Sequence, residues 1–202
     1  MVFGMTLNAG MSTVQAAGST SWNFKDSGFK SLGTITSNVT VSGLGLLANS
    51  SKTMSVIADG QTVSGTAYTH ALALGGSGSV SYRAVKVPVS SEATIKVVLR
   101  SSGSTARTLV VADASGKQLG TMKADVVAAQ ASYTYKGSDG YIYLYSSNSG
   151  INIYKIQVDD RGTTSGSTSS GSSSSGTTTP SGNTIRVKKR HNDCHRRNRK
   201  IR

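Results

Sequence analysis

The sequence is poor in several residue types that support common kinds of protein. It has one cysteine, two prolines and one tryptophan in 202 residues, and only 9 Asp and Glu against 22 Lys and Arg. A single cysteine, Cys194, excludes a disulfide within the chain and leaves residues 18–161 without thiol chemistry. No run approaches the roughly 18 apolar residues of a membrane-spanning helix, which argues against a membrane partner.

Catalytic motifs are also absent. The sequence contains no G-x-S-x-G elbow, no P-loop and no H-E-x-x-H. His70 is the one histidine of residues 18–161, and it falls inside a predicted strand, where a structural role is the simpler interpretation. We therefore expect no catalytic residues, no enzymatic activity and no cofactor. A structural calcium ion is left open, and the scattered carboxylates that could bind one are Asp59, Asp125, Asp139, Asp159 and Asp160.

Composition divides the chain into four segments. Residues 1–17 are weakly apolar, and Val14-Gln15-Ala16 fits the small-residue pattern before a signal-peptidase cut, which predicts a signal-peptide remnant and a secreted, extracellular protein. Residues 18–161 have the length of one folded domain. Residues 162–183 are almost entirely Ser, Thr and Gly, as in a flexible linker. Residues 184–202 form a basic tail that we expect to be disordered.

The positive charge is concentrated in this tail. It holds nine Lys and Arg and one Asp, a net charge of +8, while the remaining thirteen Lys and Arg and eight Asp and Glu leave +5. The tail could be an arm for nucleic acid or an anionic surface, or an out-of-frame or truncated end where a catalytic module tethered by the linker is expected but absent. The Ser/Thr-rich linker favours the second interpretation and argues against a nucleic-acid partner. His191, Cys194 and His195 give only a weak metal-binding signal.

Residues 18–161 predict an all-β domain. Apolar and polar residues alternate in 93–100, and Ile142 and Leu144 alternate with tyrosines in 140–145. Alternation with period two indicates strands with one buried face, and two such sheets pack as an antiparallel, jelly-roll-like β-sandwich. Asp113 to Gly116 predicts a hairpin turn. The expected strands are 21–24, 44–48, 53–58, 68–74, 83–89, 93–100, 107–113, 117–122, 132–136, 140–145 and 151–158.

Four polar residues occupy the same place in four different segments. Lys52, Arg83, Arg107 and Asn152 each follow a loop rich in Ser, Gly or Asn and begin a strand, in phase with the apolar residues of that strand. Since an unpaired charge cannot continue into the core, we expect these side chains to turn out at the mouth of the sandwich. If the strand starts share one end, they form a site for carboxylates. If the starts alternate ends, they are solvated residues only.

Aromatic residues add two candidates. Tyr82 and Tyr145 adjoin the same loops, so their rings are candidates for sugar stacking. Tyr141, Tyr143 and Tyr145 form a stripe on one sheet face, a pattern that more often reflects cross-strand packing. Trp22 could serve core packing or stacking equally well.

Four motifs in order carry a family resemblance: WNFKDSGF from Trp22, GGSGSVSYRAVKV from Gly75, ARTLVVADASGKQLGT from Ala106 and YIYLYSSNSGINIYKIQV from Tyr141. Together they resemble the accessory β-sandwich module of secreted bacterial pectate lyases, and are similar to the pectin-binding carbohydrate-binding modules of family 77. The resemblance implies a non-catalytic module that binds uronic-acid-rich polysaccharides of the plant cell wall, and that serves polysaccharide degradation by targeting a linked lyase or hydrolase. The resemblance also implies that Lys52, Arg83 and Arg107 bind the uronic acids.

Other functions remain as alternatives. A surface-adhesion or structural sandwich without a glycan ligand would carry the same linker. A neutral-glycan module would depend on Tyr and Trp stacking and show little sensitivity to salt. A lyase that uses Lys or Arg as its base would release unsaturated uronides, and a nucleic-acid binder would depend on residues 184–202.

Overall fold

A computed structural model describes residues 18–160. The predicted signal-peptide remnant, linker and basic tail lie outside these residues, as do Arg161 and the possible metal ligands His191, Cys194 and His195. No helix of the described part is long and apolar enough to cross a membrane.

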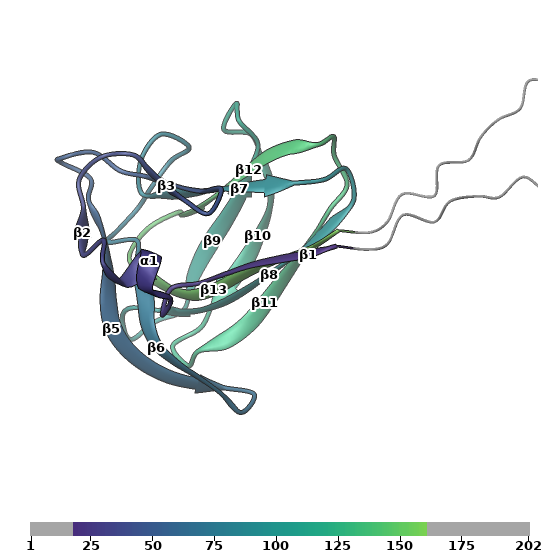
Figure 1. The fold of residues 1–202 in the computed structure, drawn as a ribbon. Coiled ribbons are helices and arrows are strands. Elements are labelled where there is room, and N and C mark those ends of the chain that lie inside the picture. Colours follow the sequence, from purple (N-terminus) through teal and green to yellow (C-terminus); the bar gives the residue numbers. More distant parts are fainter. Residues whose placement is uncertain (1–17, 161–202) are drawn as a thin grey trace, which may run out of the picture. The chain divides into compact units, whose positions relative to one another are not determined.

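The described residues form thirteen strands and one short helix (Figure 1). Every pairing between strands is antiparallel. The elements are β1 (Ser19–Asn23), α1 (Ser27–Lys30), β2 (Thr34–Ile35), β3 (Val39–Val41), β4 (Leu44–Leu47), β5 (Met54–Val63), β6 (Thr66–Ala73), β7 (Ala84–Val89), β8 (Ala93–Ser101), β9 (Arg107–Ala112), β10 (Gln118–Ala124), β11 (Ala129–Tyr135), β12 (Gly140–Ser146) and β13 (Ile151–Asp160).

Two sheets make the predicted antiparallel β-sandwich. The seven-stranded sheet has the order β11-β8-β13-β6-β5-β2, and β1 pairs with the second half of β13. The six-stranded sheet has the order β10-β9-β12-β7-β4-β3. Each predicted strand is present, and three further elements, α1, β2 and β3, were not predicted and are two to four residues long.

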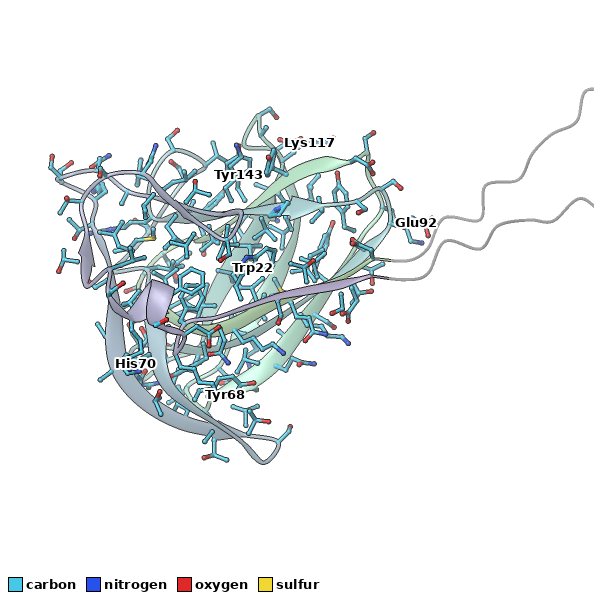
Figure 2. The ribbon with its side chains drawn as sticks, in the orientation of Figure 1. Trp22, Tyr68, His70, Glu92, Lys117 and Tyr143 are labelled. Atoms are coloured by element: carbon cyan, nitrogen blue, oxygen red, sulfur yellow. The ribbon has the colours of Figure 1, made fainter. Side chains whose placement is uncertain are left out.

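The core lies between the sheets and is built by the alternation seen in the sequence. Ile95, Val97 and Leu99 of β8 face Ile142 and Leu144 of β12 from the opposite sheet, and all five side chains are essentially buried. Trp22 also belongs to the core, with its Nε1 donating to the Ser42 carbonyl at 2.8 Å. Figure 2 shows Trp22 in the middle of the sandwich, with Tyr143 on the outer side of β12. The single tryptophan therefore serves core packing.

A β-bulge in β13 changes one expectation. The register of β13 on β8 shifts between Ile153 and Lys155, so Ile151, Ile153 and Ile156 all face the core. The prediction that Asn152 is in phase with Ile156 is wrong, because the extra residue, Tyr154, reverses the alternation. Asn152 and Tyr154 lie instead on the outer face of the seven-stranded sheet.

The outer face of the seven-stranded sheet carries a second, smaller apolar cluster. Tyr68, Ala71, Val98, Ala128 and Tyr154 pack together there. The expectation that each sheet buries one face alone is therefore incomplete, since Val98 is 4% exposed although it alternates with the core residues of β8.

Candidate functional site

The loops before β5, β7, β9 and β13 lie at one end of the sandwich, together with the β10–β11 loop, residues 125–128. We define the loop end as residues 49–53, 75–83, 101–107 and 146–150. β5, β7, β9 and β13 begin at this end, while β6, β8 and β12 end there, as their antiparallel pairings require. The strand starts that carry Lys52, Arg83, Arg107 and Asn152 therefore share one end and do not alternate.

Arg83 joins the two sheets at the loop end. Its Nε donates to the backbone oxygen of Thr53 at 3.1 Å, so a residue before β7 in one sheet holds the chain before β5 in the other. The backbone of Arg83 has a φ of 47°, a left-handed conformation that costs a residue with a side chain about 1 kcal/mol. Such conformations persist where the surrounding structure demands them, often at ligand sites.

Arg107 makes the matching contact on the other side of the mouth. Its Nη1 donates to the Gly150 carbonyl at 2.7 Å and lies 3.5 Å from the Ser102 hydroxyl. Ser102 in turn donates from its backbone and side chain to the same carbonyl, at 3.1 Å and 2.9 Å. Arg107 begins β9 of the six-stranded sheet and Gly150 precedes β13 of the other, so this contact also bridges the sheets.

The loop 146–150 connects the surroundings of the two arginines. Its first residue, Ser146, accepts the backbone N–H of Gly78 at 2.9 Å, and its last, Gly150, accepts Arg107. Gly78 must be a glycine here, because a Cβ would lie 2.5 Å from the Arg83 carbonyl oxygen and 3.0 Å from Tyr145 Cβ. Loop 75–83 is thus pressed against Tyr145, beside the base of Arg83.

Each arginine is fixed by part of its guanidinium and keeps the rest available. Among residues 18–160, Nη1 and Nη2 of Arg83 have no hydrogen-bond partner, and the same is true of Nη2 of Arg107. The one buried side-chain polar atom without a partner in this part of the chain is Asp160 Oδ1, so these guanidinium nitrogens reach solvent. Both side chains are half-buried, which limits their mobility and leaves N–H donors ready for an anion.

Lys52 and Tyr82 form an exposed pair next to Arg83. Lys52 ends a tight turn in which its backbone N–H donates to Asn49 Oδ1 at 2.8 Å. Its Nζ lies 5.9 Å from the centroid of the Tyr82 ring, within the range of a weak cation–π contact. Lys52 is exposed and Tyr82 is half-buried, so the structure brings an ammonium, a phenol ring and a guanidinium together on adjoining segments.

The tyrosines of β12 continue away from the loop end on the outer face of the six-stranded sheet. Ile142 and Leu144 are fully buried, while Tyr141 is 49% exposed and Tyr145 half-buried, as the alternation predicts. Lys86 of the neighbouring strand β7 places its Nζ 4.0 Å from the Tyr141 ring centroid. This face therefore offers aromatic rings and a further cation beyond the loop end.

Asn152 is not brought to this surface. It is 4% exposed, and its Nδ2 donates to Asp59 Oδ2 at 2.7 Å. Tyr154 donates to the same oxygen at 2.7 Å, and Arg100 binds both carboxylate oxygens of Asp59 at 3.0–3.2 Å. No sequence pattern predicted this network, which ties the bulged part of β5 to β8 and β13 on the outer face of the seven-stranded sheet.

The network keeps Asp59 ionised. Burial raises the pKa of this carboxyl, but hydrogen bonds from Tyr154, Asn152 and Arg100, together with the charge of Arg100, outweigh it and hold the pKa below its ordinary value. Burial, followed by the hydrogen bond to Asp59, raises the pKa of Tyr154 far above that of a free tyrosine. Asp59 and Arg100 are therefore paired with each other and stabilise the outer face of the seven-stranded sheet.

Charge is unevenly distributed along the sandwich. None of the four segments of the loop end contains Asp or Glu, and they contain Lys52, Arg83 and Arg107. One carboxylate, Asp125, follows β10 at the same end, where its carbonyl accepts the Ser101 N–H and its side chain pairs with Lys123. Carboxylates gather at the opposite end, where β1 begins and β13 ends, as Glu92 shows in Figure 2. They are Glu92, Asp139, Asp159 and Asp160.

The described carboxylates do not form a cluster of metal ligands. Within residues 18–160, no three His, Cys, Asp or Glu side chains gather closely enough to hold an ion. Four of the calcium candidates have other contacts: Asp59 joins the network above, Asp125 pairs with Lys123, Asp139 accepts the Ser91 N–H and Asp159 pairs with Lys96.

Among known proteins, weak structural similarities to this chain were found. No protein-family model matches the chain, and no curated protein matches it. Among solved structures, it is similar to the exo-β-1,3-galactanase Pc1,3Gal43A of Phanerochaete chrysosporium, crystallised with galactose, at a TM-score of 0.40 and 14% identity over 71% of this chain and 30% of the galactanase. It is also similar to the CBM1 of BiXyn10A in its apo form, at a TM-score of 0.30 and 14% identity over 71% of this chain and 91% of the other. At TM-scores this low, neither similarity carries an argument about function.

Proposed function

We propose that residues 18–160 form a non-catalytic carbohydrate-binding module that holds an acidic polysaccharide at the loop end. The ligand we propose is homogalacturonan, the uronic-acid backbone of pectin in plant cell walls. Lys52, Arg83 and Arg107 bind its carboxylates, and Tyr82 and Tyr145 contact its rings. Asn152 is not part of this site, because it is buried and bound to Asp59.

The observation that carries the proposal is the presence of three cations on four loops of one end that contain no Asp or Glu, while Asp125 of the neighbouring β10–β11 loop is paired with Lys123. Arginine matches a carboxylate with paired N–H donors, while lysine acts as a point charge. Because Thr53 and Gly150 hold the two guanidinium groups in place, less conformational entropy is lost when a ligand binds. A polymer with a carboxylate on each sugar unit suits several cations on one surface.

The position of the chain ends agrees with a tethered module. Asp160 donates its backbone N–H to the Gly18 carbonyl at 2.8 Å, so the described chain begins and ends at one place, opposite the loop end. A catalytic domain attached there would leave the loop end free, and the tether would raise its local concentration at the polymer. We propose that the protein is secreted and serves polysaccharide degradation in this way.

Isothermal titration with homogalacturonan of graded methyl-esterification tests the proposal. De-esterified polymer should bind, the affinity should fall as esterification removes carboxylates, and added salt should weaken binding by screening. A chain that ends at Arg161 serves as the control, because it lacks the basic tail, which would itself attract a polyanion. Binding that vanishes with the tail, or that ignores both salt and esterification, would reject the acidic-glycan proposal.

A further inference from the structure

A hollow lies away from the loop end, where the edge strands of the two sheets meet. It has a volume of about 410 Å³ and lies between β10 and β11. This volume falls within the roughly 300–1,000 Å³ of small-ligand sites. Its lining consists of Asp113, Leu119, Tyr133, Thr134, Tyr135, Lys136 and Gly137.

A bulge in β10 shapes this hollow. The register of β10 on β9 shifts between Gln118 and Gly120, which leaves Leu119 as the extra residue. Tyr133 of β11 donates its hydroxyl to the Leu119 carbonyl at 3.3 Å, and its ring covers Gly120 so closely that a Cβ there would collide with it. Bulges at sheet edges redirect side chains and often accompany functional sites.

Both tyrosines of the hollow are fixed in position. Tyr135 donates its hydroxyl to the Ser138 carbonyl at 2.8 Å, and its ring fills the space that a side chain at Gly137 would occupy. Both rings are half-buried, so part of each remains exposed. Fixed aromatic rings beside a hollow provide apolar faces on which the C–H groups of a sugar ring can pack.

The polar groups of the hollow suit a neutral ligand. Asp113 Oδ1 accepts hydrogen bonds from Ser115 and Lys117, whereas Oδ2 has no partner among residues 18–160. Lys136 is exposed and forms none of the ion pairs of the described chain. The hollow thus offers Asp113 Oδ2 as an acceptor, and the Lys136 ammonium and the Thr134 hydroxyl as donors. The charges of Asp113 and Lys136 cancel, which suits the hydroxyl groups of a neutral sugar.

We propose that this hollow binds a neutral hexopyranose unit, as a subsite separate from the cationic loop end. The inference rests on the proposed carbohydrate-binding function, but not on its acidic ligand. In this arrangement the sugar packs on Tyr135, a hydroxyl donates to Asp113 Oδ2 and another accepts from Lys136. Two separate subsites would let one module hold a polymer at two points or two chains at once.

The test is an amide chemical-shift titration of the full chain with two neutral probes, β-1,4-linked galactotetraose and β-1,4-linked glucotetraose. We expect saturable shifts at Thr134, Lys136 and Gly137 with at least one probe, insensitive to salt. Tyr135→Leu should weaken this binding at least about tenfold, equivalent to about 1.4 kcal/mol, while Tyr135→Phe keeps the ring and the affinity. Homogalacturonan binding by Tyr135→Leu should be unchanged, which also shows that the variant is folded.

The outcomes separate the two proposals. Shifts at the hollow that Tyr135→Leu removes support the second subsite, even if homogalacturonan fails to bind at the loop end. If neither neutral probe shifts the hollow while homogalacturonan binds, the second subsite is wrong and the proposed function stands. If neither the probes nor homogalacturonan bind, both proposals are rejected.

Discussion

Arg83 Nε and the Thr53 carbonyl oxygen lie 3.1 Å apart, and this contact joins the start of β7 to the start of β5 across the mouth of the sandwich. Arg107 and Gly150 repeat the arrangement between β9 and β13 at 2.7 Å. Both arginines come before or at the first residue of a strand in the six-stranded sheet, and both reach a carbonyl that precedes a strand in the other sheet. The same side chains therefore close the loop end and supply its charge.

The position of Arg107 can be disturbed without changing any charge. A Cβ added to Gly103 would collide with Arg107 Nη2, the far end of a flexible side chain that can move aside. We expect Gly103→Ala to weaken homogalacturonan binding about threefold to tenfold and to change the free energy of unfolding by less than about 0.5 kcal/mol. Titration and urea unfolding measure the two effects. Gly60→Ala is the matched control, since a Cβ there meets nothing within 4 Å, and equal affinity of both variants would contradict a role for Arg107.

Lys52 should contribute through charge alone. Its side chain is exposed, and among residues 18–160 it forms no hydrogen bond or ion pair and only a weak cation–π contact with Tyr82, at 5.9 Å, so Lys52→Ala should leave stability nearly unchanged. We expect it to reduce the affinity for homogalacturonan about twofold to fivefold at low salt, with the difference shrinking as salt is added. Titrations at two salt concentrations check this. A reduction that persists at high salt would point to a steric role instead.

The Asp59 network should matter for stability and not for binding. Asp59→Asn leaves the guanidinium of Arg100 without its charged partner on the outer face of the seven-stranded sheet. We expect the free energy of unfolding to fall by about 2–3 kcal/mol, measured by urea denaturation. Asp26→Asn should have little effect, because Asp26 is exposed and caps α1 without a side-chain hydrogen bond. Similar stability of the two variants would mean that the network contributes little.

Asp159 predicts a loss of stability in acid. Hydrogen bonds from Lys96, Gln157 and Ser19 lower its pKa from 3.8 to about 2. The folded state thus binds fewer protons than the unfolded state in this range, so the stabilisation present above about pH 4 is lost as the pH falls toward 2. Urea unfolding from pH 5 to pH 2 should show a flatter decline for Asp159→Asn than for the natural chain. Lys96→Met should flatten the decline too. Parallel curves for all three proteins would contradict the attribution of the acid-induced loss of stability to Asp159.

Local patterns were enough to predict most of the fold. The strands with buried faces, such as β8 and β12, have a clear alternation. The predicted turn at Asp113 is confirmed, because the Asp113 N–H donates to the Lys117 carbonyl and the Gly116 N–H donates to the Asp113 carbonyl. β2 and β3 are too short to give such a signal. The bulge at Tyr154 could not be read from alternation, because it reverses the phase midway along β13.

The candidate site was predictable in its position and not in its contacts. The strand starts of Lys52, Arg83 and Arg107 were visible in the sequence, and antiparallel pairing then places them at one end. The carbonyl partners Thr53 and Gly150 belong to the opposite sheet, and the sequence does not state how the sheets are aligned. The Asp59 network was missed because its members lie on three strands, although Asp59-Gly60 within an apolar segment is a signal of a bulge.

The central claim is that Arg83 and Arg107 bind carboxylates of homogalacturonan at the loop end. Its most direct test is isothermal titration of the Arg83→Ala, Arg107→Ala double variant with de-esterified homogalacturonan, beside a Lys117→Ala, Lys136→Ala variant with the same change in charge. Both variants are made in the chain that ends at Arg161, and circular dichroism establishes that they are folded. We predict that the arginine variant loses salt-sensitive binding while the lysine variant keeps it. Equal binding by the two variants would contradict the claim.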